Sequence, residues 1–322
     1  MTSPTVILHT DTPREAIGIV SDAHSDLELH GCDNHAALPG LIADTGAEVV
    51  YSVRFADSLP FPRAALVAGG PVRWVSVGGS GIDHLVPWDM ARVTVTNAAG
   101  VAADMMAEYV LGTYLSFTLD LARFRGLQAE RRWISDGSVR PAMGGTVLIL
   151  GLGKTGQAVA RRMQAMGLTV LGVRARPQET PNCDEVHGME ALPGLWPRAD
   201  LVVACVPLLD STRGLIDGAA FAAMKPGAVL VDVSRGGVTD EAALIAALGS
   251  GAIRGAALDV FATEPLPAES PLWGMENLII TPHCSSVDAG WSARSVRMFA
   301  ENLGRYRRGE VLSNIVDPGR GY

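Results

Sequence analysis

The 322-residue sequence has few cysteines, no long apolar run and no excess of basic residues. Its 4 cysteines form no CxxC pair and no disulfide-like spacing, which favours a reducing, cytoplasmic setting. The longest uncharged, mostly apolar stretch, residues 109–119, is too short to cross a bilayer, and residues 1–15 carry no signal-peptide pattern. A net charge of −8 argues against nucleic acid or an anionic membrane as the main partner.

What the sequence does contain is typical of a packed α/β protein. The hydrophobic fraction of 48% excludes dominant disorder, and the length suggests about two domains of roughly 150 residues. Short apolar runs alternate with helical stretches, and several runs are continuous, as in strands buried on both faces of a parallel sheet. The expected strands are 5–8, 48–53, 74–77, 93–96, 146–150, 169–173, 201–205, 229–233, 256–259 and 278–281. The expected helices are 102–133, 154–166 and 291–308.

A glycine-rich turn follows one of these strands and opens a helix. Its residues are Gly151, Gly153, Lys154, Thr155 and Gly156, in a G-x-G-x-x-G pattern. Gly151 permits a tight turn, Gly153 leaves room for a pyrophosphate, and Gly156 lets helix and strand approach closely. The strand and helix context favours a dinucleotide site over a purely structural turn. We therefore expect two doubly wound, parallel-sheet domains of the Rossmann-like or flavodoxin-like kind.

Two arginines stand where the next strand ends. Sites that take NAD usually have an acidic residue here, whose carboxylate accepts hydrogen bonds from the ribose 2′-hydroxyl. This sequence has Arg174, with Arg176 close behind, and guanidinium groups can bind a phosphate bidentately. NADP is therefore expected as the preferred cofactor, with NAD still possible. The alternative is that both arginines are solvated surface residues.

Three segments that follow later strands supply one arginine, one carboxylate and one histidine, namely Arg235, Glu264 and His283. An arginine can hold a substrate carboxylate and polarise a carbonyl, and a histidine can donate a proton to a developing alkoxide. A carboxylate paired with that histidine favours its protonated form. Each residue alone also suits an ordinary structural role. Together, at the sheet edge where α/β proteins bind ligands, they suit the reduction of a 2-oxo acid.

These segments resemble the D-isomer-specific 2-hydroxyacid dehydrogenase family over nearly the whole chain. The resemblance is carried by GLGKTG at 151–156, MKPGAVLVDVSRGG at 224–237, LDVFATEPLP at 258–267 and ITPH at 280–283. It implies that Arg235, Glu264 and His283 form the catalytic trio. The further cofactor contacts that it implies are the side chain of Asp259 to the nicotinamide carboxamide, the backbone of Val206 and Val233, and His283. The implied contacts to the substrate come from the backbone of Gly79, Ser80 and Gly81, and from Arg235 and His283.

Arg174 and the C-terminal VDPGRGY, residues 316–322, are similar to the NADPH-dependent glyoxylate/hydroxypyruvate reductase branch of that family. The family architecture implies a substrate-binding domain made of residues 1–99 and 291–322, a dinucleotide-binding domain at 100–290, an active site in the cleft between them, and a homodimer. The implied reaction is NAD(P)H-dependent reduction of a small 2-oxo acid, such as glyoxylate or hydroxypyruvate, to the D-2-hydroxy acid. Hydride comes from the nicotinamide and the proton from His283.

Three alternatives carry less weight. A dinucleotide-sensing corepressor of the same fold can retain the trio, but no extended basic or disordered tail is present. A formate dehydrogenase has Gln where this sequence has Glu264. A metal site at His24, His30, Cys32 and His35 is not expected, because their spacing fits no zinc pattern and the segment reads as a polar loop.

Overall fold

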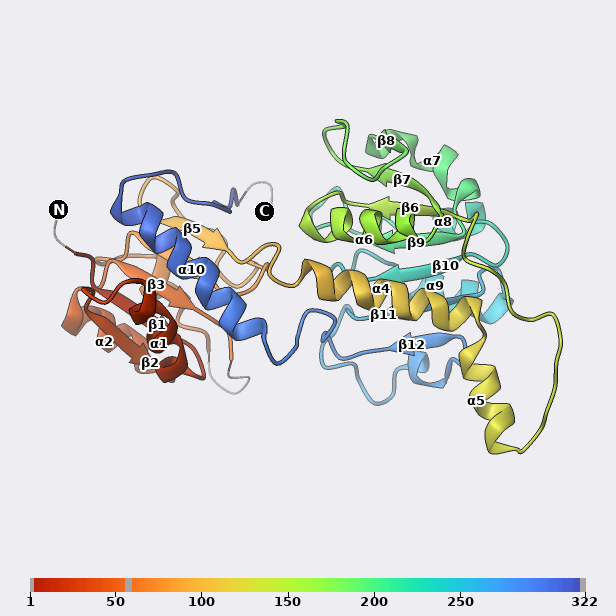
Figure 1. Ribbon diagram of the computed structural model, residues 1–322, viewed down its shortest axis with the longest axis horizontal. Helices are drawn as coiled ribbons and strands as arrows, with labels where there is room; N and C mark the ends of the chain where they lie inside the picture. Colours follow the sequence, from red (N-terminus) through yellow and green to blue (C-terminus); the bar gives the residue numbers. More distant parts are fainter. Residues whose placement is uncertain (1–2, 56–59, 319–322) are drawn as a thin grey trace. The chain divides into compact units, whose positions relative to one another are not determined.

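The computed structural model describes residues 3–55 and 60–318, and the chain divides into two compact units (Figure 1). Unit 1 comprises Met1–Val101 and Asp288–Tyr322, and unit 2 comprises Ala102–Val287. The assignment of these units to substrate and to cofactor binding stays a prediction. Of the 316–322 motif, residues 319–322 lie outside the described residues.

Unit 1 is built on a parallel sheet of 5 strands in the order β2-β1-β3-β4-β5. The strands are β1 (Val6–His9), β2 (Leu29–Cys32), β3 (Val49–Ser52), β4 (Trp74–Val77) and β5 (Thr94–Asn97). The helices are α1 (Pro13–Ala23), α2 (Leu38–Thr45), α3 (Arg63–Val67) and α10 (Trp291–Arg307). Helices α1 and α10 cover one face of the sheet, and α2 and α3 the other. All side chains of β1, β3 and β4 are therefore buried, which explains why these strands are mostly apolar.

Strand β2 occupies a segment that the sequence reading treated as a polar loop, and that reading is wrong. The strand pairs with β1 in parallel, with Val6 opposite Leu29 and His9 opposite Cys32. It lies at the sheet edge and is only partly buried, so it lacks the continuous apolar run of a central strand. A Cβ on Gly31 would lie 2.9 Å from Cβ of Pro13, so the strand needs glycine where α1 crosses it.

A buried histidine pair lies at the carboxyl end of β1. Nδ1 of His9 is 2.8 Å from Oγ of Ser52, and Nε2 of His9 is 2.9 Å from Nδ1 of His35. The rings of Phe55 and Phe61 pack against both imidazoles. Burial lowers the pKa of His9 to about 3 and also lowers the pKa of His35. Both histidines are therefore neutral at physiological pH.

Unit 2 is built on a parallel sheet of 7 strands in the order β12-β11-β10-β9-β6-β7-β8. The strands are β6 (Thr146–Leu150), β7 (Thr169–Val173), β8 (Glu185–His187), β9 (Leu201–Ala204), β10 (Val229–Asp232), β11 (Gly255–Leu258) and β12 (Leu278–Ile280). The helices are α4 (Ala103–Thr118), α5 (Leu121–Ala129), α6 (Lys154–Ala165), α7 (Leu192–Leu195), α8 (Gly218–Ala223) and α9 (Glu241–Ser250), with short 3-10 turns at Met189–Ala191, Trp196–Arg198 and Pro271–Gly274. Two parallel α/β sheets confirm the expected fold class.

Separate apolar cores cover the two faces of this sheet. Helices α4 and α6 pack on one face, and α7, α8 and α9 pack on the other. The strand order reverses beside β6, whose neighbours are β7 and β9. Ligands of open α/β sheets bind outside the carboxyl ends of the strands at such a reversal. The glycine-rich turn follows β6 and therefore stands at this point.

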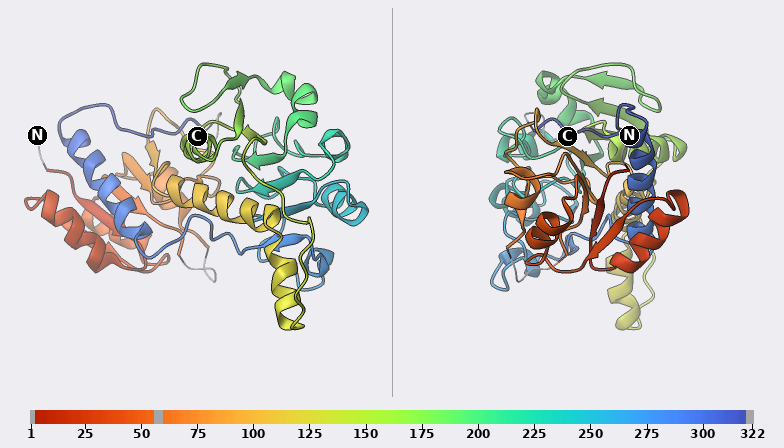
Figure 2. Two further views of the ribbon diagram at one scale, coloured as in Figure 1. Left: turned by 45° about the vertical axis from the view of Figure 1, so that its right-hand side comes forward. Right: turned by 90° about the vertical axis from the view of Figure 1, so that its left-hand side faces the viewer.

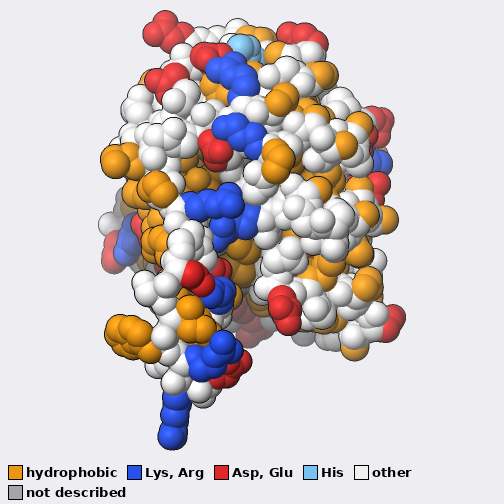
Figure 3. Space-filling view, turned by 90° about the vertical axis from the view of Figure 1, so that its right-hand side faces the viewer, with side chains coloured by type: hydrophobic (Ala, Val, Ile, Leu, Met, Phe, Trp, Pro, Cys, Tyr) orange, Lys and Arg blue, Asp and Glu red, His pale blue; other side chains and the backbone are white. Residues whose placement is uncertain are grey.

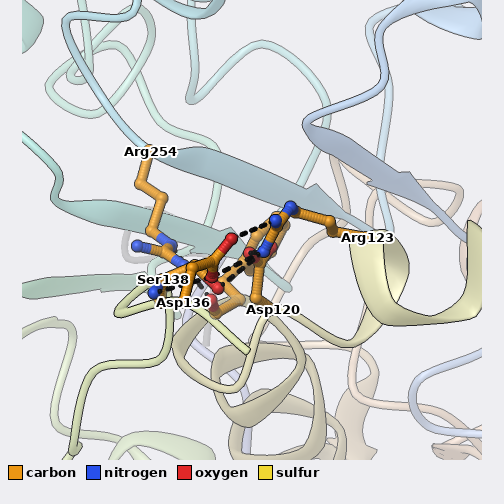
Figure 4. A network of polar contacts seen from close by, with 6 residues as sticks. Asp120, Arg123, Asp136, Ser138 and Arg254 are labelled. Atoms are coloured by element: carbon orange, nitrogen blue, oxygen red, sulfur yellow. Dashed lines mark hydrogen bonds and ion pairs between the residues drawn. The ribbon is translucent and has the colours of Figure 1, made fainter. Parts of the chain in front are cut away.

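The single helix expected at 102–133 is two helices instead. Asp120 separates α4 from α5 with φ of 55°, a left-handed conformation that ends the first helix. The second helix projects from the rest of unit 2 at an angle to α4 (Figure 2). Arg123 on α5 contacts the carboxylates of Asp120 and Asp136, and Arg254 donates to the carbonyl oxygen of Ser138, so that the returning chain is tied down (Figure 4).

Candidate active site

The glycine-rich turn has the shape that a dinucleotide requires. Gly151 has φ of 95°, and a Cβ there would lie 2.8 Å from the carbonyl oxygen of Cys205. A Cβ on Gly156 would lie 1.9 Å from the carbonyl oxygen of Gly151, so α6 can approach the turn only with glycine at this position. A Cβ on Gly153, by contrast, would meet no atom within 4 Å, and no side chain caps the first turn of α6. The amides of that turn are thus open to an anion, and the residues fit a pyrophosphate.

The other residues assigned to the cofactor surround this turn. Lys154 and Thr155 begin α6, and the Thr155 hydroxyl lies 3.6 Å from Sδ of Met106. Cγ1 of Val206 would lie 3.1 Å from a Cβ on Gly151, and the amide of Val233 donates to the carbonyl oxygen of Ala204. The four assigned residues therefore lie at the carboxyl edge of the sheet or at the start of α6, around the strand reversal.

Arg174 and Arg176 follow β7 at the same edge. The amide nitrogen of Arg174 donates a hydrogen bond of 3.1 Å to the carbonyl oxygen of His187 on β8, and this bond fixes the backbone at Arg174. Arg174 is half-buried and Arg176 is exposed. Within residues 3–55 and 60–318, no carboxylate pairs with either guanidinium, so both are available to an external anion.

His283 and Glu264 lie in direct contact. Nδ1 of His283 is 2.8 Å from Oε2 of Glu264, and the other oxygen, Oε1, accepts the amide of Phe261 at 2.9 Å. The carboxylate is therefore held from both sides. Because an ionised carboxylate only accepts hydrogen bonds, Nδ1 of His283 carries the proton in this contact. Nε2 is therefore the ring nitrogen that can exchange a proton with a substrate. His283 itself has φ of 53°, so its backbone is strained and must be held by the surrounding loop.

Asp259 supplies that hold. Its Oδ1 accepts the hydroxyl of Thr281 at 2.6 Å and the amide of Cys284 at 2.9 Å, and its Oδ2 accepts the amide of Ser285 at 2.9 Å. The carboxylate is buried, and these three donors flank His283 on both sides. The sequence reading gave Asp259 only a contact to the nicotinamide carboxamide, which stays a prediction, and missed its place in the histidine loop.

Tyr109 of α4 extends this network. Its hydroxyl lies 2.9 Å from Oγ1 of Thr281, and because Thr281 gives its only hydroxyl proton to Asp259, Tyr109 is the donor. Burial raises the pKa of Tyr109 to about 12, so the phenol keeps its proton. The sequence offered no signal for this contact, because 172 residues separate the two hydroxyls.

Arg235 follows β10, beside the strand that precedes Glu264 and two strands from the one that precedes His283. Its Nη1 donates to the carbonyl oxygen of Ser234 at 2.7 Å. The trio and the glycine-rich turn thus all lie in unit 2, at the carboxyl edge of one sheet. Among the described residues, no group of histidine, cysteine and acidic side chains is arranged to hold a metal ion.

The loop Gly79–Gly81 belongs to unit 1 and follows β4. Its carbonyl groups are held from the end of β5, because the amide of Ala98 donates to Gly79 at 2.9 Å and Nδ2 of Asn97 donates to Ser80 at 2.8 Å. Within the described chain, no hydrogen bond takes up the amides of Ser80 and Gly81. Two neighbouring N–H groups are therefore free to meet a carboxylate.

Comparison with known proteins identifies the class. Residues 111–285 match the family described as D-isomer specific 2-hydroxyacid dehydrogenase, NAD binding domain, and the chain belongs to this family. The chain is 34% identical over 290 residues to a glyoxylate reductase from Korarchaeum cryptofilum, covering 84% of this chain and 85% of that protein.

Two solved structures extend the likeness to the whole chain. One is a D-isomer specific 2-hydroxyacid dehydrogenase from Xanthobacter autotrophicus in complex with NADPH and MES, with 32% identity, a TM-score of 0.85 and 100% of both chains covered. The other is the NADPH-dependent glyoxylate/hydroxypyruvate reductase of Sinorhizobium meliloti in complex with NADP and sulfate, with 26% identity, a TM-score of 0.82 and 100% of both chains covered. In the part of this chain that the structure describes, no helix is long and apolar enough to cross a membrane.

Proposed function

We propose that this protein reduces a small 2-oxo acid, of the size of glyoxylate or hydroxypyruvate, to the D-2-hydroxy acid with NADPH. The observation that carries the proposal is the His283–Glu264 pair, whose ring and carboxylate are 2.8 Å apart at the sheet edge that also bears the glycine-rich turn. A histidine held in this way at the carboxyl edge of a dinucleotide fold is placed to handle a proton beside a carbonyl. Family membership and the glyoxylate reductase relatives agree with this chemistry.

His283 delivers the proton. Its Nδ1–H is committed to Glu264, so the imidazolium gives up the proton on Nε2 to the carbonyl oxygen as negative charge develops there. Glu264 accepts the hydrogen bond from Nδ1 of His283 and so fixes the orientation of the ring. When bound, the nicotinamide supplies the hydride to the carbonyl carbon.

Arg235 holds the substrate carboxylate and polarises the carbonyl, with its planar fork matched to two oxygens. The loop of Gly79, Ser80 and Gly81 in unit 1 offers the amides of Ser80 and Gly81 to a substrate carboxylate, and Gly79 anchors this loop through its carbonyl group. A substrate anchored by its carboxylate presents one face of its carbonyl to the cofactor, which sets the D configuration of the product.

Residues at the carboxyl edge of the unit 2 sheet would hold the cofactor. The amides at Gly153, Lys154 and Thr155 bind its pyrophosphate, and Gly151 and Gly156 provide the turn. Arg174 and Arg176 bind the 2′-phosphate, and this makes NADPH preferred over NADH. The backbone of Val206 and Val233, the carboxylate of Asp259 and the ring of His283 line the nicotinamide end.

The test measures NADPH oxidation, as the loss of NADPH absorbance, with each of a panel of 2-oxo acids as substrate. The panel holds glyoxylate, hydroxypyruvate, pyruvate, a bulky branched 2-oxo acid, and one 2-oxo acid with a phosphate at its far end. Glyoxylate or hydroxypyruvate should give the highest kcat/KM, with the product resolved as the D-isomer. Turnover that is fastest with the bulky or phosphorylated acid would refute the substrate class, and no turnover with any acid would favour the corepressor-like alternative.

We further propose that the protein is a homodimer formed through residues 119–143, here named the arm. The arm includes α5 and the chain that returns from it, and the contacts among Asp120, Arg123 and Asp136 hold it in shape. Trp133 is 99% exposed and Met143 is 74% exposed, whereas large apolar side chains in a monomer are mostly covered. Figure 3 shows hydrophobic side chains on this lower, projecting part of the surface, next to basic ones.

A further inference from the structure

Asp232, the last residue of β10, is a buried carboxylate, and the trio does not include it. It is 1% exposed. Its Oδ1 accepts the amide of Ser234 at 2.9 Å and also the Ser234 hydroxyl, and its Oδ2 accepts the hydroxyl of Thr239 at 2.6 Å. Burial raises the pKa of Asp232, and the donors from Ser234 and Thr239 oppose that shift. A carboxylate is costly to bury unless hydrogen bonds compensate for the lost water. The groups that supply these hydrogen bonds therefore indicate what Asp232 does in the fold.

The donors identify what the carboxylate holds. All three come from residues 234 and 239, which are the two ends of the turn that carries Arg235. Ser234 and Thr239 are themselves buried, at 3% and 5% exposure. Within the turn, the amide of Val238 donates to the carbonyl oxygen of Arg235 at 3.2 Å. One carboxylate therefore ties the two ends of the turn together, and Arg235 directly follows one of these ends.

The same turn is packed against the loop that carries Glu264. A Cβ on Gly236 would lie 1.8 Å from the carbonyl oxygen of Phe261, so the two backbones touch directly. The amide of Phe261 donates in turn to Oε1 of Glu264. Any shift of the 234–239 turn would therefore displace Phe261, whose amide holds the carboxylate of Glu264 beside His283.

We propose that Asp232 is a positioning residue, which with Ser234 and Thr239 holds Arg235 at the angle that its carboxylate contact requires. The inference rests on the proposed role of Arg235 in substrate binding. Because a bidentate contact needs the guanidinium plane aligned, a turn that can rock loses substrate affinity. Most of the proposed cofactor contacts, at the glycine-rich turn and at Arg174 and Arg176, follow other strands of the sheet and do not involve this turn. Loosening the turn should therefore raise KM for the 2-oxo acid more than KM for NADPH.

The test uses Thr239→Val, which keeps the shape of the side chain but removes the hydroxyl, and Thr239→Ser, which restores it. Thr239→Val should raise KM for the 2-oxo acid about tenfold, a fraction of what a charge-assisted hydrogen bond contributes. KM for NADPH should stay within about twofold, and Thr239→Ser should recover the wild-type values within about twofold. Thr118→Val, the same exchange at a buried threonine at the end of α4, is the matched control and should change neither KM.

A merely structural role for Thr239 would lower the melting temperature without splitting the two KM values, and that result would overturn the proposal. Should Thr239→Val fail to fold, Ser234→Ala removes one of the three donors and is measured in the same way. Equal increases in both KM values, in either variant, would also overturn it.

Arg235→Lys separates this inference from the proposed function. If Arg235→Lys binds the 2-oxo acid like wild type, the role of Arg235 fails and this inference fails with it. If Arg235→Lys is impaired but Thr239→Val is not, only the inference fails. Where both are impaired, the double variant decides: it should be no worse than Arg235→Lys alone, because Thr239 acts through Arg235. Multiplying effects would show that Thr239 acts independently, and would overturn the proposal.

Discussion

Acidification should loosen unit 1 through His9. The folded chain holds the pKa of His9 at about 3, by burial, against an ordinary value of 6.5. A histidine with a lowered pKa binds its proton more readily in the unfolded chain, so its contribution is complete above pH 6.5 and is lost as the pH falls towards 3. Each pH unit within that window lowers the free energy of unfolding by about 1.4 kcal/mol. A change from about pH 7.5 to about pH 5 should therefore lower it by about 2 kcal/mol.

Neighbouring groups act in the same direction. Burial lowers the pKa of His35 and of His84, and the guanidinium of Arg54 opposes a further positive charge on both. The hydrogen bond between Nε2 of His9 and Nδ1 of His35 requires one of these nitrogens to lack a proton, so both rings cannot be fully protonated while it persists. Acid therefore breaks this contact as well as charging a buried ring.

The assay is hydrogen exchange by mass spectrometry on peptides from β1 and β3, corrected for the pH dependence of chemical exchange. A loss of about 2 kcal/mol makes opening about 30-fold more frequent at about pH 5 than at about pH 7.5. His9→Gln should weaken unit 1 at neutral pH, because the imidazole contacts go, but should flatten this pH dependence. His30→Gln, the same exchange beside Glu28 on the same unit, is the control and should keep the wild-type slope. A wild-type protein with no pH dependence, or a His9→Gln protein with the wild-type slope, would refute the reasoning.

Three further predictions concern the proposed function. His283→Ala should lower kcat by about two to four orders of magnitude, the usual contribution of a positioned general acid, while the Kd for NADPH from fluorescence titration stays nearly unchanged, because the ring is one of many cofactor contacts; near-normal turnover would contradict the assignment. Wild type should prefer NADPH over NADH by at least about tenfold in kcat/KM, because one charge-assisted contact contributes about 1.5–3 kcal/mol, and Arg174→Asp should reverse the order. Equal kcat/KM values in the wild type would mean that the arginines face solvent. Trp133→Asp should shift the mass measured by light scattering from dimer to monomer, whereas a monomeric wild type, or a variant that stays dimeric, would rule out the arm as the interface.

The central strands could be predicted from the sequence because their burial is written in consecutive apolar residues. The ranges 74–77, 146–150 and 169–173 agree with β4, β6 and β7 residue for residue. The two strands that were missed, β2 and β8, lie at sheet edges, where one side is partly exposed and polar residues are tolerated. The break at Asp120 was also missed, since it depends on a single left-handed residue whose polar contacts form only in the folded unit.

The site divides in a similar way. The sequence placed Glu264 and His283 after neighbouring strands, and their contact follows from that placement. It did not indicate which groups Asp232 and Asp259 bind, because those partners are backbone amides and hydroxyls whose directions are set by the loops. One signal was nonetheless present: within two of the candidate segments, an acidic residue stands at the end of an apolar strand or directly after it. An acid at such a position is expensive to bury and is therefore a candidate for holding the loop that follows.

The order in which the chain is synthesised has a consequence for how unit 1 can mature. The chain leaves unit 1 after Val101 and returns at Asp288, and α10 then covers the sheet face that includes Tyr51 and Trp74. At translation rates of about 5–20 residues per second, the intervening segment takes roughly 10–40 s to emerge. Unit 2 can complete its own core during that interval, whereas part of the unit 1 sheet remains uncovered. The nascent protein therefore exposes an apolar surface until α10 has left the ribosome, which makes this interval the period of greatest need for a chaperone.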